Sequence, residues 1–286
     1  MSRSEALGEL KTVELAQGTI HYRERGTGPA VVFVHGALVN GDLWRDVVPA
    51  LAPAYRCIAL DLPLGSHQLP ARPEADLTPR GLARLVSDAL DALDARDVTL
   101  VGNDTGGAIC QLVVAHHPAR VARLVLTNCD AFEHFPPPLV LPFAWGGHVP
   151  GFVPALAALL RLGPARRLLY GLLARRRADP ATLDSYFAPL IADAGVRRDL
   201  AKVLRGVSNK ATLEAARLFP SVHKPVLLAW GEDDILFPLR DAERLARAFP
   251  DARLVRVPGA RAFVPEDQPA ALAQLIAEFA RGAVAA

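Results

Sequence analysis

The chain has 286 residues, of which 51% are hydrophobic and 22% are charged, so it can bury a large core without disulfides or metals. Its 32 Lys and Arg residues nearly balance its 30 Asp and Glu residues, and its one obvious basic cluster lies at residues 161–177. Because nucleic-acid binding needs a concentrated positive surface, we expect no nucleic-acid partner.

Three features bear on where the protein works. Cys57, Cys110 and Cys129 each lie in or beside an apolar run, which is typical of buried free thiols in a reducing compartment. Residues 1–18 lack the apolar stretch of an export signal, so we expect a cytoplasmic protein. Residues 134–160 carry no charged side chain, but six prolines interrupt them. We therefore expect an apolar lid there and no membrane anchor.

Eight short apolar segments are predicted strands. Residues 12–25 form two of them around Gln17 and Gly18, and the composition of the other six is typical of strands buried on both faces. These six lie at residues 30–36, 56–63, 97–103, 121–129, 225–231 and 252–259. Thr78 as N-cap and Pro79 begin the clearest helix, and further helices are expected after Asp104 and at residues 239–249 and 269–279.

Strands that alternate with helices predict a mostly parallel sheet covered by helices on both faces. The alternation stops once, because residues 132–219 contain helical patterns and no comparable strand. We therefore expect a two-part α/β core, residues 1–131 and 220–286. A helical cap, residues 132–219, is expected between the sixth and seventh strands.

The stretch "LVGNDTGGAIC", residues 100–110, places Asp104 where a strand should turn into a helix. Glycines at positions 102 and 106 suit a sharp turn whose central residue is strained. Ligands of parallel sheets bind beyond the carboxyl ends of the strands, where a helix also directs its first amides and its positive dipole. An N-cap would explain the carboxylate but not both glycines, so we predict that this turn presents Asp104 for chemistry.

Two other segments converge on the same edge of the sheet. His35 and Gly36 end the third strand, where the amide of Ala37 can join that of Thr105 as a donor pair for an oxyanion. The stretch "WGEDDILFP", residues 230–238, ends a later strand in carboxylates. The three segments together favour a catalytic site over an isolated helix cap.

The chain resembles the α/β-hydrolase family over residues 12–282, through "GNDTGG", "HGALVNGDLWRDVVPAL", "WGEDD" and "VPGARAFVPEDQP". With Asp at the turn, it is similar to the branch of haloalkane dehalogenases, haloacetate dehalogenases and epoxide hydrolases. The resemblance implies the α/β-hydrolase fold, with an eight-stranded sheet. It also implies Asp104 as the nucleophile that forms an alkyl-enzyme ester. Asp234 matches the acid that orients the base, and Asp233 is the weaker match.

The resemblance fails at the base itself. Ala262 stands where the family carries its histidine, and no histidine follows His223. A carboxylate attacks without a base, but hydrolysis of the resulting ester needs one, and general-base catalysis contributes about 10²–10⁴-fold. His67, after the fourth strand, is the best-placed substitute base, and His134, at the start of the cap, is a second candidate. His21, His116, His117 and His223 are less well placed.

Other departures concern the substrate. Thr105 and Ala37 stand where haloalkane dehalogenases carry halide-holding side chains, and neither offers a side-chain N–H donor. Tyr170 and Tyr186 of the cap are expected to pack rather than to donate a proton. The apolar lid predicts a small lipophilic substrate. The residues expected to contact it are His35, Trp44, His134, Phe135, Trp145 and Phe263.

Three functions stay open on the sequence alone. The first is a hydrolase that uses Asp104 on an alkyl halide, epoxide or ester, with hydrolysis impaired or run by a non-standard base. The second is a lyase, isomerase or cyclase in which Asp104 transfers a proton, and the third is a small-molecule binding protein. Ala262 could also be an introduced change. No metal or organic cofactor is expected, because ligand spacings and a GxGxxG stretch are lacking. No feature predicts an oligomeric state.

Overall fold

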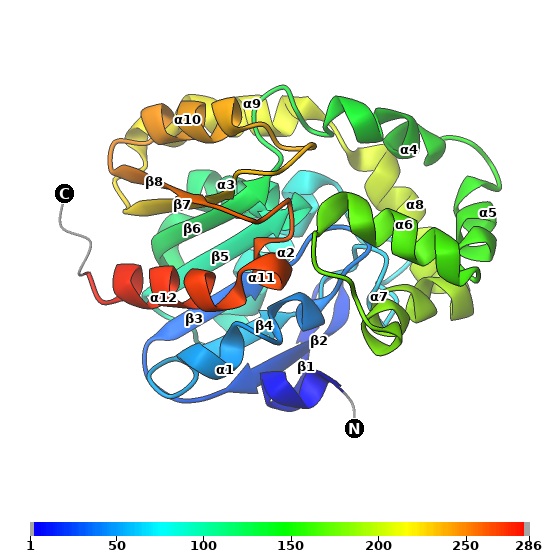
Figure 1. Cartoon of the computed structure of the whole chain (residues 1–286), viewed down its shortest axis with the longest axis horizontal. Coiled ribbons are helices and arrows are strands. Elements are labelled where there is room, and N and C mark those ends of the chain that lie inside the picture. The colour runs from blue at the N-terminus through cyan, green and yellow to red at the C-terminus, as the bar shows by residue number, and fades with distance from the viewer. Residues whose placement is uncertain (1–2, 283–286) are drawn as a thin grey trace.

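The computed structural model describes residues 3–282 and contains all eight predicted strands (Figure 1). They form one sheet in the order β1-β2-β4-β3-β5-β6-β7-β8. Their bounds are Glu9–Leu15 (β1), Gly18–Arg25 (β2), Ala30–Val34 (β3), Arg56–Leu60 (β4), Val98–Asp104 (β5), Val121–Cys129 (β6), Val226–Gly231 (β7) and Ala252–Val257 (β8).

Most of the sheet is parallel, as the alternation of strands and helices predicts. The hairpin of β1 and β2 is antiparallel, β2 pairs antiparallel with β4, and the pairings from β4 to β8 are parallel. All five residues of β3 are buried, because helices cover both faces of the sheet. The carboxyl ends of β3, β5, β6 and β7 therefore meet at one edge, toward the helical insertion.

The core helices pack on the two faces of the sheet (Figure 1). One face carries α1 (Val48–Leu51) and α12 (Pro269–Ala280), which contact each other beside the short α11 (Val264–Asp267). The other carries α2 (Pro79–Ala92), α3 (Thr105–His116) and α10 (Leu239–Ala248). Thr78 caps α2 as predicted, because its hydroxyl accepts from the amide of Gly81 at 3.2 Å.

Six α-helices lie between β6 and β7, in the part of the chain where a cap is expected. They are α4 (Leu141–Gly146), α5 (Phe152–Leu159), α6 (Gly163–Leu173), α7 (Pro180–Ala192), α8 (Ala194–Gly206) and α9 (Asn209–Leu218). The first five lie beyond the carboxyl edge of the sheet, whereas α9 packs against α3 (Figure 1). From residue 3 to residue 282, no helix has both the length and the apolar character needed to cross a bilayer.

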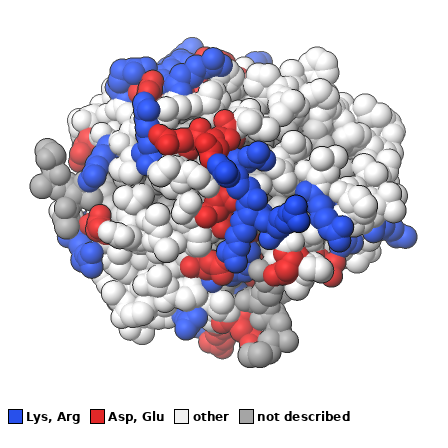
Figure 2. All heavy atoms as spheres, viewed as in Figure 1, with Lys and Arg blue, Asp and Glu red and all other residues white. Residues whose placement is uncertain are grey.

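The connection between α6 and α7 is bound firmly to the core. The amide of Phe263 donates to the carbonyl of Leu173 at 2.8 Å, and the amides of Arg175 and Arg176 each donate to Asp267 at 2.8 Å. Arg175 also pairs with Asp233. On the face drawn in Figure 2, charged side chains gather along this seam, whereas the surface over α4 is largely uncharged.

Candidate functional site

The turn at Asp104 is the strained strand-to-helix turn that the glycines predict. Asp104 ends β5 with φ of +54° and ψ of −133°, a backbone conformation that is costly for a residue with a side chain. A Cβ atom on Gly106 would lie 2.4 Å from the carbonyl oxygens at the end of β3, and one on Gly102 would lie 2.8 Å from Sγ of Cys110. Neighbouring atoms therefore approach both glycines too closely to leave room for a Cβ atom.

The carboxylate of Asp104 does not cap its own helix in the usual way. It makes no side-chain cap bond to α3. Its Oδ2 accepts instead from the amide of Ala37, 3.1 Å away on the loop after β3, and the amide of Thr105 lies close enough to lower its pKa. Burial raises the pKa of Asp104 to about 7, the two amides lower it, and the nearby Asp234 carboxylate raises it further. This carboxyl can therefore gain and lose a proton near neutral pH.

Asp104 opens onto a cavity of about 290 Å³ between the sheet edge and the helical insertion. The polar side chains among the lining residues are Asp104, Thr105, Asp130, Tyr170 and Tyr186. The remaining lining residues are apolar and come from the loop after β3, residues 135–144, α6, α7, α8, the loop after β7, and Phe263. Such a chamber suits a small molecule that is mostly hydrocarbon.

Asp234 lies near Asp104 but does not line the cavity. Its Oδ2 accepts from the side chain of Asn128 at 2.6 Å, and its Oδ1 accepts from the amide of Leu236 at 2.8 Å. Burial raises the pKa of Asp234 to about 6, although these hydrogen bonds lower it. Asn128 also bonds both backbone groups of Gly231, so it fixes the end of β7 and the loop that carries Asp234.

Ala262 lies in the predicted loop and is fully buried, yet it does not line the cavity. Its carbonyl accepts from the side chain of Asn103 at 2.7 Å, which ties the loop after β8 to the residue before Asp104. The next residue, Phe263, does line the cavity. The loop is therefore held beside the turn at Asp104, but the side chain of its residue 262 is a methyl group, which cannot act as a base.

The three candidate histidines each bond protein groups outside the cavity. In His35, Nδ1 donates to the carbonyl of Gly36 and Nε2 accepts from the amide of Leu62, both at 2.8 Å, and burial lowers its pKa to about 4. His67 has Nε2 3.2 Å from Oδ2 of Asp199 and accepts from the amide of Gly65 at Nδ1. In His134, Nδ1 lies 2.6 Å from Oδ2 of Asp241. None of the three lines the cavity.

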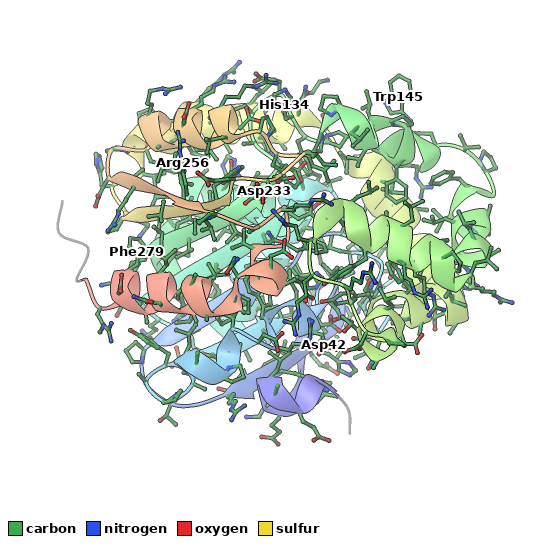
Figure 3. All side chains as sticks on the ribbon, in the orientation of Figure 1. Asp42, His134, Trp145, Asp233, Arg256 and Phe279 are labelled. Atoms are coloured by element: carbon green, nitrogen blue, oxygen red, sulfur yellow. The ribbon has the colours of Figure 1, made fainter. Side chains whose placement is uncertain are left out.

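The four aromatic residues expected to contact substrate divide into two groups. Phe135 and Phe263 line the cavity. Trp44 is fully buried in the core, with its ring 5.0 Å from that of Phe33. Trp145 is 66% exposed, and Figure 3 shows it pointing away from the molecule.

Tyr170 and Tyr186, from the helical insertion, both line the cavity, with ring centroids 6.5 Å apart. The hydroxyl of Tyr186 donates to Glu266 at 2.7 Å and accepts from Arg45 at 3.2 Å. Arg45 and Glu266 form a buried two-bond pair at 2.5–2.6 Å. The hydroxyl of Tyr170 is buried without a hydrogen-bond partner, and burial raises its pKa. The Arg45–Glu266 pair joins the loop after β3 to α11, and both of its members bond the hydroxyl of Tyr186.

Sequence reasoning missed Asn128, the Arg45 and Glu266 pair, and Asp130. Asp130 directly follows β6, is only 2% exposed and lines the cavity. A polar residue after the end of a buried parallel strand is the signal that could have found it. Within residues 3–282, no three His, Cys, Asp or Glu side chains come together in a way that could hold a metal ion. The three cysteines are free and buried, as predicted.

Comparison with known proteins agrees with this geometry. Residues 29–269 match the α/β-hydrolase fold family. Haloalkane dehalogenase 2 of Mycobacterium tuberculosis is 31% identical to this chain over 276 residues, which cover 94% of each protein. The solved structure of haloalkane dehalogenase DbeA from Bradyrhizobium elkani has a TM-score of 0.80 at 21% identity and covers 96% of this chain and 98% of its own.

A solved α/β-hydrolase fold protein from Burkholderia ambifaria has a TM-score of 0.79 at 24% identity, with 94% of this chain and 97% of its own covered. The dehalogenase relatives support the expectation of a hydrolase. The family match and the 31% identity over nearly the whole chain show that this protein belongs to the α/β-hydrolase fold family.

Proposed function

We propose that this protein is a hydrolase that uses Asp104 as a nucleophile on a small apolar molecule of the alkyl halide, epoxide or ester type. One observation carries the proposal: a carboxylate on a strained turn opens onto an apolar cavity, where the amide of Ala37 donates to it and the amide of Thr105 lies close by. Strain of this kind persists only where surrounding structure enforces it. The dehalogenases among the relatives support the same chemistry.

In the first step, an oxygen of Asp104 attacks an sp³ carbon of the substrate. The new C–O bond forms as the bond to the leaving group breaks, which leaves an uncharged alkyl ester on Asp104. Residues 132–219 act as a cap in this proposal, because their helices supply most of the apolar wall and keep water from competing.

In the second step, water attacks the carbonyl carbon of that ester. The charge that develops on the carbonyl oxygen is stabilised by the amides of Ala37 and Thr105, both of which already favour the ionised carboxylate in the free protein. Ala262 supplies no base for the water. We therefore expect the second step to be slower by up to about 10²–10⁴-fold than with a histidine there, unless another group serves.

A second candidate is proton transfer by Asp104 in a lyase, isomerase or cyclase. The pKa of about 7 favours this candidate, because a general acid or base works best when its pKa lies near the operating pH. Such an enzyme would turn over substrate without ever carrying a covalent group on Asp104.

Intact-mass analysis separates these functions. The protein is incubated with a primary bromoalkane, a terminal epoxide and a short-chain ester, alongside the variants Ala262→His and Asp104→Asn. We expect an adduct on Asp104 that Ala262→His clears faster and that Asp104→Asn never forms. Turnover that never labels Asp104 in any variant supports proton transfer, and saturable ligand binding without turnover or adduct supports a binding protein.

A further inference from the structure

We propose that Asp130 is a second catalytic residue of this site, which protonates the leaving oxygen of an epoxide and then serves as the base for water. This inference rests on the proposed role of Asp104 as the nucleophile. It gives the site a base that comes from the end of β6 instead of from the loop that holds Ala262.

The fold brings the two carboxyl groups near enough for the charge of Asp104 to raise the pKa of Asp130. Asp104 pairs with Cys129 across β5 and β6, so Asp130 is the residue immediately after the partner of the nucleophile. Thr105 lies near both carboxyl groups, because its amide lowers the pKa of Asp104 and its side chain lowers that of Asp130. The side chain of Gln111 donates to the carbonyl of Asp130 at 2.8 Å, which fixes the backbone there.

One oxygen of the Asp130 carboxyl group makes no hydrogen bond. Its Oδ1 is buried and has no hydrogen-bond partner, although an unsatisfied buried polar atom costs about 1–3 kcal/mol. Asp130 lines the same cavity as Asp104. The fold thus holds a carboxyl group with a buried, unpaired oxygen in a residue that lines the cavity beside Asp104, which a purely structural carboxyl would not require.

Electrostatics divides the roles between the two groups. Two neighbouring buried carboxyls cannot both ionise easily. Burial first, and then the Asp104 charge, raise the pKa of Asp130 well above its usual range, whereas two amide donors hold that of Asp104 lower. At neutral pH the arrangement therefore favours an ionised Asp104, the nucleophile, beside a protonated Asp130, the acid.

The proton and electron pairs balance for an epoxide. The Asp104 carboxylate attacks a ring carbon, the ring C–O bond breaks, and the oxygen takes the proton of Asp130, which becomes a carboxylate. Asp130 then removes a proton from water as the hydroxide attacks the ester carbonyl of Asp104. The departing alkoxide takes the acid proton left on Asp104, so a diol is released and both groups return to their starting state. A halide leaves as an anion and needs no proton, so Asp130 then loses its proton to solvent.

The test uses Asp130→Asn, which keeps the shape of the side chain but cannot transfer a proton, and Asp251→Asn as a surface control. Intact mass against time gives the rates of adduct formation and clearance with a terminal epoxide and with a primary bromoalkane. Urea midpoints confirm that each variant is folded. We expect Asp130→Asn to slow clearance of either adduct by about 10²–10⁴-fold, and to slow adduct formation much more with the epoxide than with the bromoalkane.

The alternatives give different results. If Asp130→Asn clears both adducts at the wild-type rate, or slows formation equally with both reagents, Asp130 has no proton-transfer role and only this inference fails. If neither the wild type nor any variant forms an adduct or turns over either reagent, the nucleophilic role of Asp104 fails and this inference fails with it. Asp251→Asn should match the wild type throughout.

Discussion

Replacement of Asp104 by Asn should stabilise the fold at neutral and alkaline pH. The folded protein holds the pKa of this carboxyl at about 7, against 3.8 for an ordinary Asp, chiefly because burial disfavours its charge. Between these two values the unfolded chain ionises the group while the folded chain keeps its proton. Unfolding is therefore increasingly favoured as pH rises from about 4 to about 7, by up to about 4 kcal/mol, and no further above that.

Asp104→Asn has no proton to lose, so it avoids this cost while its amide oxygen still accepts from Ala37. Urea unfolding of the wild type and of Asp104→Asn, at several pH values from about 4 to about 8, measures the difference. We expect the free energy of unfolding of the variant, relative to that of the wild type, to rise from about pH 4 to about pH 7 and to stay constant above that. Asp251→Asn, on the surface, should show no such trend. A variant that is no more stable than the wild type at about pH 8 would refute the claim that the fold stores this electrostatic cost.

Two further substitutions test the scaffold by urea unfolding, each against a control. Gly106→Ala should cost several kcal/mol or prevent folding, because its Cβ would lie 2.4 Å from two carbonyl oxygens; Gly163→Ala, in open space on α6, should be neutral or slightly stabilising. Similar effects at both positions would contradict the packing argument. Glu266→Gln should cost about 3–5 kcal/mol, because it leaves the Arg45 guanidinium buried beside a neutral partner, whereas Glu214→Gln, in an exposed pair, should cost about 1 kcal/mol or less. Equal losses would show that burial of the pair is unimportant.

The sheet could be predicted from the sequence because its strands carry strong local signals. Runs such as the one at residues 30–34 are apolar throughout and rich in Val, which is typical of a short strand buried on both faces. The tight turn at Asp104 could also be predicted, because it has glycines on both sides, at positions where neighbouring atoms leave no room for a side chain. These features depend on residues near one another in the chain.

The polar contacts of the site could not be predicted in the same way. His67 is placed by Asp199, a residue of α8 more than a hundred positions later in the sequence, and Arg45 finds Glu266 across a still longer separation. Trp145 sits in an apolar stretch yet faces outward. Such contacts depend on how the helices of the insertion pack against the core, and hydrophobic periodicity alone does not determine that packing.

The hydrogen bonds between the α6–α7 connection and the core bear on the route by which a ligand enters the cavity. The carbonyl of Leu173 accepts from the amide of Phe263, and the amides of Arg175 and Arg176 donate to the carboxylate of Asp267, so moving the insertion on that side would break several bonds at once. The opposite side, near α4, presents mostly uncharged surface in Figure 2, and Leu139, a wall residue of the chamber, is 60% exposed there. We therefore expect an apolar ligand to enter and leave the cavity past α4, while the side formed by α6 and α7 stays fixed.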